Sequence, residues 1–209
     1  EADARTAAAV RSIAKGLHED RPLRTSTLER VLGLMRDVPG VIVSDMRLSR
    51  SPSDPAPHQP TITLGANRVR GLLYSDNHGT IDGARMRGYS SVSLSSLAVP
   101  GDQLQVDLFS IPSSDFRFFF GQAKASVPLG ANGLRLALSA SRASSFQELA
   151  GPDQHGKSRQ LTADMAFPFA KSRALSIVGH ASLGDWKSQE KIAGTVFQRD
   201  RLQVARAWV

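Results

Sequence analysis

Apolar and polar residues alternate along most of this chain after about residue 67. The clearest alternation runs from Gln103 to Leu108 and from Leu134 to Ser141, with longer versions at 160–167 and 175–183. Successive side chains on a strand point to opposite faces, so each run predicts a strand with one apolar and one polar face. From these runs and the turn residues between them, we expect strands at about 68–76, 84–97, 102–111, 116–128, 133–146, 158–169, 173–186 and 192–208.

The first 40 residues follow a helical period instead. Val10, Ile13, Ala14 and Leu17 have the spacing of a one-sided helix, which we expect to end by Pro22. A second helix is expected from Ser26, because Ser26–Glu29 matches a capping box. Its buried stripe would be formed by Leu28, Val31, Leu32 and Met35.

The second helix is expected to stop at Asp37–Gly40, where proline and glycine cannot continue it. Short apolar runs at 41–48 and 61–64 then predict two strands, separated by a proline-rich loop at 51–60. We therefore predict two domains: a small α/β module at 1–66 and a β domain at 67–209.

The two-faced strands fit two architectures. In a transmembrane β-barrel the apolar face meets lipid and the polar face lines the lumen, and about ten residues suffice for each crossing. In a soluble β-sandwich the apolar faces pack on each other. The chain has no apolar run long enough for a membrane helix. It opens at Glu1–Arg5 without a signal-peptide core, so an exported protein would be represented here by a processed or truncated piece.

Composition and motifs argue against several function classes. The net charge is +7, which is compatible with nucleic acid, but the basic residues are scattered and have few aromatic neighbours. Cysteine is absent and the five histidines share no metal-ligand spacing. The chain lacks the common motifs of serine hydrolases, nucleotide-binding proteins and zinc proteases. We therefore expect no enzyme activity, no metal, no cofactor and no nucleic-acid partner.

Several sequence motifs occur in the order known from one protein family. The segment Leu28–Val41 resembles the second POTRA domain of two-partner secretion transporters, the outer-membrane hemolysin activator and filamentous hemagglutinin transporter family. Downstream similarities occur at 76–83, 101–104, 128–136, 166–175 and 200–204. Each motif is weak alone, whereas the ordered series is specific. The residues that carry the POTRA signature are Leu28, Glu29, Arg30, Asp37, Pro39 and Gly40.

The resemblance implies a fold, a location and a partner. The chain would be a partial POTRA domain followed by about eight antiparallel strands, roughly half of a sixteen-strand barrel. It would sit in the Gram-negative outer membrane, in contact with outer-membrane lipid, with the POTRA part in the periplasm. The POTRA would bind an unfolded secreted exoprotein, and the barrel would translocate it. The arginine motif of the family's inward-folded loop is not carried over to Met86–Tyr89.

Candidate functional residues follow from the polar faces and from the POTRA sheet. The pore-lining candidates are Gln122, Lys124, Arg135, Asp164 and His180. The simpler interpretation is that each solvates one face of a sheet. An exposed edge of the POTRA sheet could accept an extended peptide as an added strand. Two alternative functions stay open: a barrel-assembly or insertion factor of the same superfamily, and a soluble β-sandwich binding domain.

Overall fold

The computed structural model describes residues 4–19, 23–49, 59–77, 86–113, 116–148 and 152–209. Within them the helices are α1 (Ala4–Ala14), α2 (Gly16–Glu19) and α3 (Thr25–Arg36). The strands are β1 (Val41–Ser49), β2 (Gln59–Ala66), β3 (Val69–Asp76), β4 (Arg87–Ser95), β5 (Gln103–Ile111), β6 (Phe116–Pro128), β7 (Arg135–Gln147), β8 (Gln154–Lys171), β9 (Ser176–Ile192) and β10 (Thr195–Trp208).

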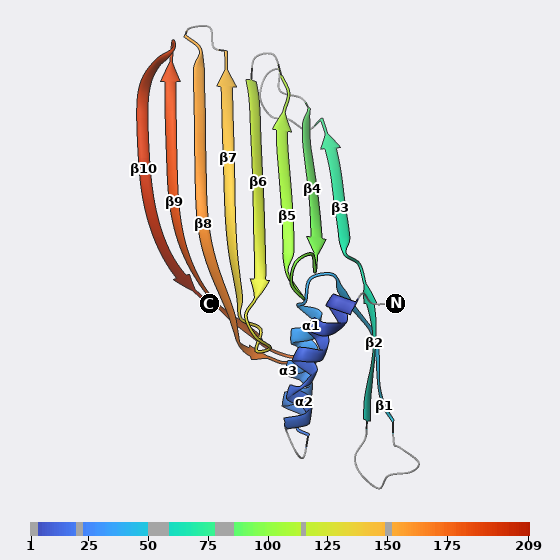
Figure 1. Cartoon of the computed structure of the whole chain (residues 1–209). Coiled ribbons are helices and arrows are strands. Elements are labelled where there is room, and N and C mark those ends of the chain that lie inside the picture. Colours follow the sequence, from blue (N-terminus) through green and yellow to red (C-terminus); the bar gives the residue numbers. More distant parts are fainter. Residues whose placement is uncertain (1–3, 20–22, 50–58, 78–85, 114–115, 149–151) are drawn as a thin grey trace.

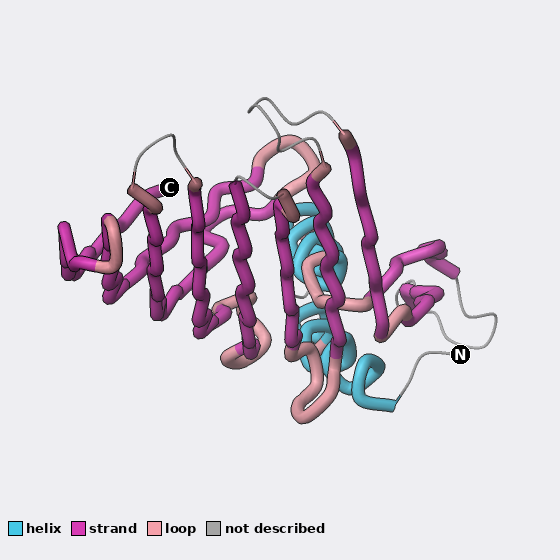
Figure 2. The backbone as a smooth tube through the Cα atoms, turned by 90° about the horizontal axis from the view of Figure 1, so that it is seen from above, coloured by secondary structure: helices cyan, strands magenta, loops and turns pink. Residues whose placement is uncertain are grey.

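Strands β3 to β10 form one antiparallel sheet in which every strand pairs with its neighbours in the sequence. The sheet is curved, and its outer strands β3 and β10 lie far apart (Figures 1 and 2). Strands β1 and β2 form a separate two-stranded sheet beside the helices. The predicted fold class is confirmed: a small α/β part precedes eight antiparallel strands with a barrel-like arrangement.

The two faces of the large sheet differ as the alternation predicted. On the apolar face Leu104 is 37% exposed and Leu136 is 39% exposed, so neither is covered by a second layer of described residues. On the polar face Asp107 is 6% exposed and Ser139 is 9% exposed. A β-sandwich would have buried the leucines, so the sandwich alternative is wrong. None of the described helices is long and apolar enough to cross a membrane.

The last hairpin differs from the prediction. We expected a break between 186 and 192, but β9 continues to Ile192 and β10 begins at Thr195. The chain reverses at Ala193 and Gly194, which both have positive φ, at 50° and 78°. Two successive residues with positive φ match the right-handed twist of a tight hairpin. Residues 187–191 are all polar and lie on the strand, so the alternation of apolar and polar residues could not mark them as strand.

The predicted capping box is wrong. Helix α3 begins at Thr25, its N-cap is Arg24, and no side chain makes a capping hydrogen bond there. The backbone N–H of Leu28 donates instead to the carbonyl of Arg24 at 3.1 Å. Ser26 therefore lies inside the first helical turn. The expected proline-rich loop at 51–60 falls largely outside the described residues, and only its last two positions are seen, at the start of β2.

The small module has its own core. Val10 of α1 packs with Val31 and Met35 of α3. Partly buried residues complete this core, namely Ile13, Ala14, Leu17, Val41, Val43, Ile62 and Leu64. In the predicted stripe of α3, Leu28 and Leu32 are only partly buried. Leu34, which the stripe did not include, is 5% exposed because it faces the large sheet.

Candidate functional site

The five pore-lining candidates all lie on the polar face of the sheet. Lys124 is directly opposite Ser139, and Ser139 is opposite Thr162. Asp164 is two residues from Thr162 on β8 and therefore points to the same face. His180 is opposite Ala166, which is two residues from Asp164, so His180 shares this face as well. Gln122 and Arg135 share this face because they are two and four residues from Lys124 and Ser139. The structure thus brings the candidates onto one surface, and their role as a pore lining stays a prediction.

Two of these five residues already have fixed partners. Arg135 donates to the carbonyl of Gly101 at 3.1 Å and to Ser126 Oγ at 2.9 Å. The His180 ring stacks on Trp208, with a centroid distance of 5.0 Å. Arg135 therefore holds a turn in place, whereas Lys124 is exposed to the space beside the sheet.

A carboxylate organises the same face on the earlier strands. Asp107 accepts hydrogen bonds from Tyr89 Oη at 2.8 Å and from Gln105 Nε2 at 2.9 Å. The bond from Tyr89 links β4 to β5 through side chains, whereas Gln105 and Asp107 both lie on β5. The sequence analysis did not single out Asp107, although its place within an alternating run put it on the polar face.

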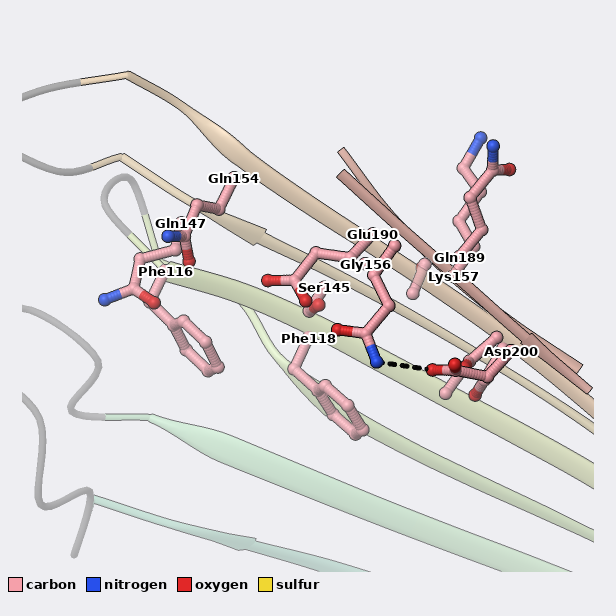
Figure 3. Close-up of a pocket in the computed structure, with 15 residues that line it drawn as sticks. Phe116, Phe118, Ser145, Gln147, Gln154, Gly156, Lys157, Gln189, Glu190 and Asp200 are labelled. Atoms are coloured by element: carbon pink, nitrogen blue, oxygen red, sulfur yellow. Dashed lines mark hydrogen bonds between the residues drawn. The ribbon is translucent and has the colours of Figure 1, made fainter. Parts of the chain in front are cut away.

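A hollow of about 340 Å³ lies on the sheet near the ends of the strands that are farther from the helices. Figure 3 shows two phenylalanines, Phe116 and Phe118, along one side, with polar side chains from β7 to β10 around them. Gln198 Nε2 donates to Asp200 Oδ2 at 2.7 Å. The lining residues come from five strands, β6 to β10. The hollow therefore depends on how these strands pair, which the sequence alone does not show. The described residues contain no group of acidic or histidine side chains that could hold a metal ion.

All three charged residues of the predicted POTRA signature contact the large sheet or its turns. Arg30 donates from its guanidinium to the carbonyls of Pro168 at 3.2 Å, Phe169 at 3.3 Å and Asn132 at 3.5 Å. Glu29 Oε2 accepts the backbone N–H of Arg173 at 3.2 Å. We call the three connections that face the helices, residues 95–102, 128–134 and 170–175, the docking turns.

Gly40 marks the point where the module joins the sheet. Its φ is +78°, and a Cβ there would lie 2.8 Å from the carbonyl oxygen of Asn67 and from Ser95 Cβ. The N–H of Asn67 donates to the carbonyl of Gly40 at 2.8 Å. Only glycine fits both the backbone conformation and the space. Of the remaining signature residues, Leu28 and Pro39 are partly buried, and Asp37 forms an ion pair with Lys171 at the end of β8.

Asp102 closes the first docking turn. Its carboxylate accepts the backbone N–H groups of Leu97, Ala98 and Val99 at 2.6, 2.8 and 2.9 Å. Burial alone would raise the pKa of Asp102, but these three N–H donors stabilise the charged form and lower the pKa below its ordinary value. One indication of this turn came from the sequence: the resemblance to the transporter family placed residues 101–104, which include Asp102, at a hairpin.

Comparisons with known proteins identify a similar fold. No protein-family model matches the chain, and no curated protein matches it. Among solved structures, the chain is similar to CdiB from Acinetobacter baumannii, with a TM-score of 0.66 and 13% sequence identity. The match covers 88% of this chain and 36% of that chain. The similarity shows a shared fold, and this chain spans about a third of the length of CdiB.

Proposed function

We propose that this chain is part of an outer-membrane transporter for two-partner secretion. The α/β module would be the POTRA domain that binds an unfolded exoprotein in the periplasm, and the β domain would be the first part of the barrel that translocates it. One observation carries the proposal: eight consecutively paired strands keep apolar residues on one face and polar residues on the other. The fold similarity to CdiB, a two-partner secretion transporter, supports it.

The positions of the helices define the proposed orientation of the sheet in the membrane. They pack at one end of the sheet, against the docking turns (Figure 1). In this assignment the α/β module is the POTRA domain, so the helices and the docking turns would face the periplasm, directly below the polar face. A chain bound by the module would reach that face without crossing lipid.

The polar face is suited to a passing polypeptide. Its side chains are mostly amides, hydroxyls and single charges, which exchange hydrogen bonds with water or with a peptide at similar free energy. No single tight pocket is needed for transport, and a strongly binding site would slow it. Energy would come from folding of the exoprotein outside the cell.

Site-specific photocrosslinking in the full-length protein tests this function. A photoreactive residue at Lys124 or Asp164 should crosslink to the exoprotein during secretion. The matched controls are Leu138 and Leu183 on the apolar face, which are 62% and 65% exposed and should crosslink to lipid only. Equal crosslinking from both faces, or none from the polar face, would contradict the proposed path. Loss of other barrel proteins on depletion, with secretion intact, would favour an assembly factor instead.

A further inference from the structure

Four cationic residues lie side by side on the apolar face of the sheet, one on each of four neighbouring strands. Arg142 of β7 is directly opposite Arg159 of β8. Arg159 is opposite Lys187 of β9, and Lys187 is opposite Arg201 of β10. Opposite residues of antiparallel strands have Cβ atoms about 5 Å apart, so the four side chains form a continuous line. We call these four residues the cation row.

The cation row borders an apolar surface on its helix side. On each of these four strands, the two residues of the same face that come next toward the helices are mostly apolar. They are Leu138, Ala140, Leu161, Ala163, Leu183 and Ala205, with Asp185 and Gln203 as the two polar members. The row therefore marks the edge at which the apolar face ends.

More positive charge lies on the other side of the row. Lys157 and Arg199 are two residues farther from the helices on β8 and β10. A hollow of about 610 Å³ is lined by all six of these cationic residues. The arrangement thus combines a concentrated positive charge with a space that a ligand group can enter.

The positive charge is only partly neutralised within the protein. Asp185 lies 2.9 Å from Arg201 and 3.6 Å from Lys187. Arg142 and Arg159 are exposed and form no ion pair with a residue that the structure describes. Like charges directly opposite each other destabilise a sheet. A bound anion would remove this repulsion, and guanidinium groups bind phosphate through paired N–H donors.

The height of the row fits a lipid headgroup region. Lys187 is ten residues beyond Ile177 on β9, and at about 3.3 Å per residue this is roughly 33 Å along the strand. With a strand tilt of about 40°, the height along the membrane normal is roughly 25 Å, the typical height of a barrel's apolar band. If the band begins near Ile177, the row lies where the headgroups of the far leaflet begin.

We propose that the cation row binds the phosphate groups of lipids in the leaflet farther from the helices. This inference rests on the proposed function, because it requires the apolar face to meet lipid. A phosphorylated glycolipid such as lipid A presents two phosphates on one rigid headgroup, which suits a line of adjacent cations. Bound lipid would also hold β7 to β10 together on their outer face.

Native mass spectrometry of the full-length protein with diphosphorylated lipid A as the probe tests this site. The Arg142→Gln/Arg159→Gln variant should bind lipid A roughly tenfold more weakly than wild type, because it lacks two guanidinium groups that would bind phosphate. Arg70→Gln/Arg206→Gln removes the same charge from the opposite, polar face, where both residues are exposed, and should bind normally. The migration shift of folded barrels on unheated gels verifies that each variant is folded.

A second measurement needs no variant. Wild-type protein should prefer diphosphorylated lipid A over its phosphate-free form and over phosphatidylcholine vesicles. Equal affinity for all three, or unchanged binding by the folded Arg142→Gln/Arg159→Gln variant, would overturn the proposal. Binding of polyglutamate in preference to lipid A would also overturn it. Exoprotein crosslinking from Lys124 is scored separately, so failure of lipid binding and failure of the transport path give different results.

Discussion

Lys171 Nζ lies 2.7 Å from Asp37 Oδ2, so an ion pair joins the end of β8 to the residue that caps helix α3. The stem of Lys171 also lies against Gly33, where an added Cβ would be 2.5 Å from Lys171 Cγ. The side chain of Lys171 therefore lies against helix α3 from its Cγ atom to its ammonium group. Helix α3 and the large sheet therefore make direct side-chain contacts, in addition to their connection through the chain.

The charge of this ion pair should add little to docking. The Asp37 side chain is 48% exposed, and an ion pair in contact with water contributes about 0.2–1 kcal/mol. In a double-mutant cycle of Lys171→Met and Asp37→Asn, we expect a coupling free energy below about 1 kcal/mol. Thermal unfolding of the detergent-solubilised protein measures it. A larger coupling would mean that the pair is shielded from water.

Arg30→Ala should loosen the module more than loss of that ion pair. Arg30 donates to the carbonyl of Asn132 in one docking turn and to the carbonyls of Pro168 and Phe169 in β8, and we expect a loss of about 1–2 kcal/mol of docking free energy. Spin labels at the exposed positions Arg11 and Gln160 should report a broader distance distribution. The control Arg36→Ala changes an exposed arginine of the same helix. An unchanged distribution for Arg30→Ala would show that packing alone holds the module.

Gly40→Ala should destabilise the junction between module and sheet. A Cβ would clash with the Asn67 carbonyl, and the left-handed backbone itself costs an L-residue about 1–2 kcal/mol. Gly130→Ala is the matched control, because its φ is +75° but its nearest contact would be 3.9 Å away. Thermal unfolding should show a larger loss for Gly40→Ala. Equal losses would indicate that the neighbours of Gly40 move aside.

Asp102 should make the first docking turn sensitive to acid. Its lowered folded-state pKa means that the charged form adds stability above the unfolded-state value of about 3.9. That contribution is lost as the pH falls through the lower folded-state pKa. Asp102→Asn should cost about 1–3 kcal/mol at pH 7, since three N–H donors lose a charged acceptor. In pH-dependent unfolding, the difference from wild type should shrink below about pH 4. A constant difference would contradict this.

The two faces should respond oppositely to an added charge. Leu138→Arg places a cation on the apolar face, and arginine at the middle of a lipid-facing barrel surface costs about 2–4 kcal/mol. Gln160→Arg adds the same side chain to the exposed polar face and should be tolerated. Folding yield into lipid vesicles measures both effects. Similar yields for the two variants would contradict a lipid-facing sheet.

Only part of the docking could be predicted from the sequence. The signature at Leu28–Gly40 indicated a helix, its end and a turn, and β1 begins directly afterwards. That Glu29 and Arg30 bind carbonyl and N–H groups more than 100 residues away depends on how the helix packs on the sheet. The capping box failed for a related reason. Local hydrogen bonding favours Ser26 at the helix start, but α3 begins one residue earlier and its side chains serve contacts with the rest of the chain.

The sequence by itself determined the strands and their two faces, because side chains alternate along an extended backbone whatever its neighbours are. It could not place Arg142 beside Arg159, Lys187 and Arg201, which are up to 59 positions apart in the chain. Their alignment requires the pairing register of three hairpins, and a shift of one residue would move each cation to the other face. The register is set by turns and by packing at the docking turns, so the cation row and the hollow of Figure 3 exist only in the folded sheet.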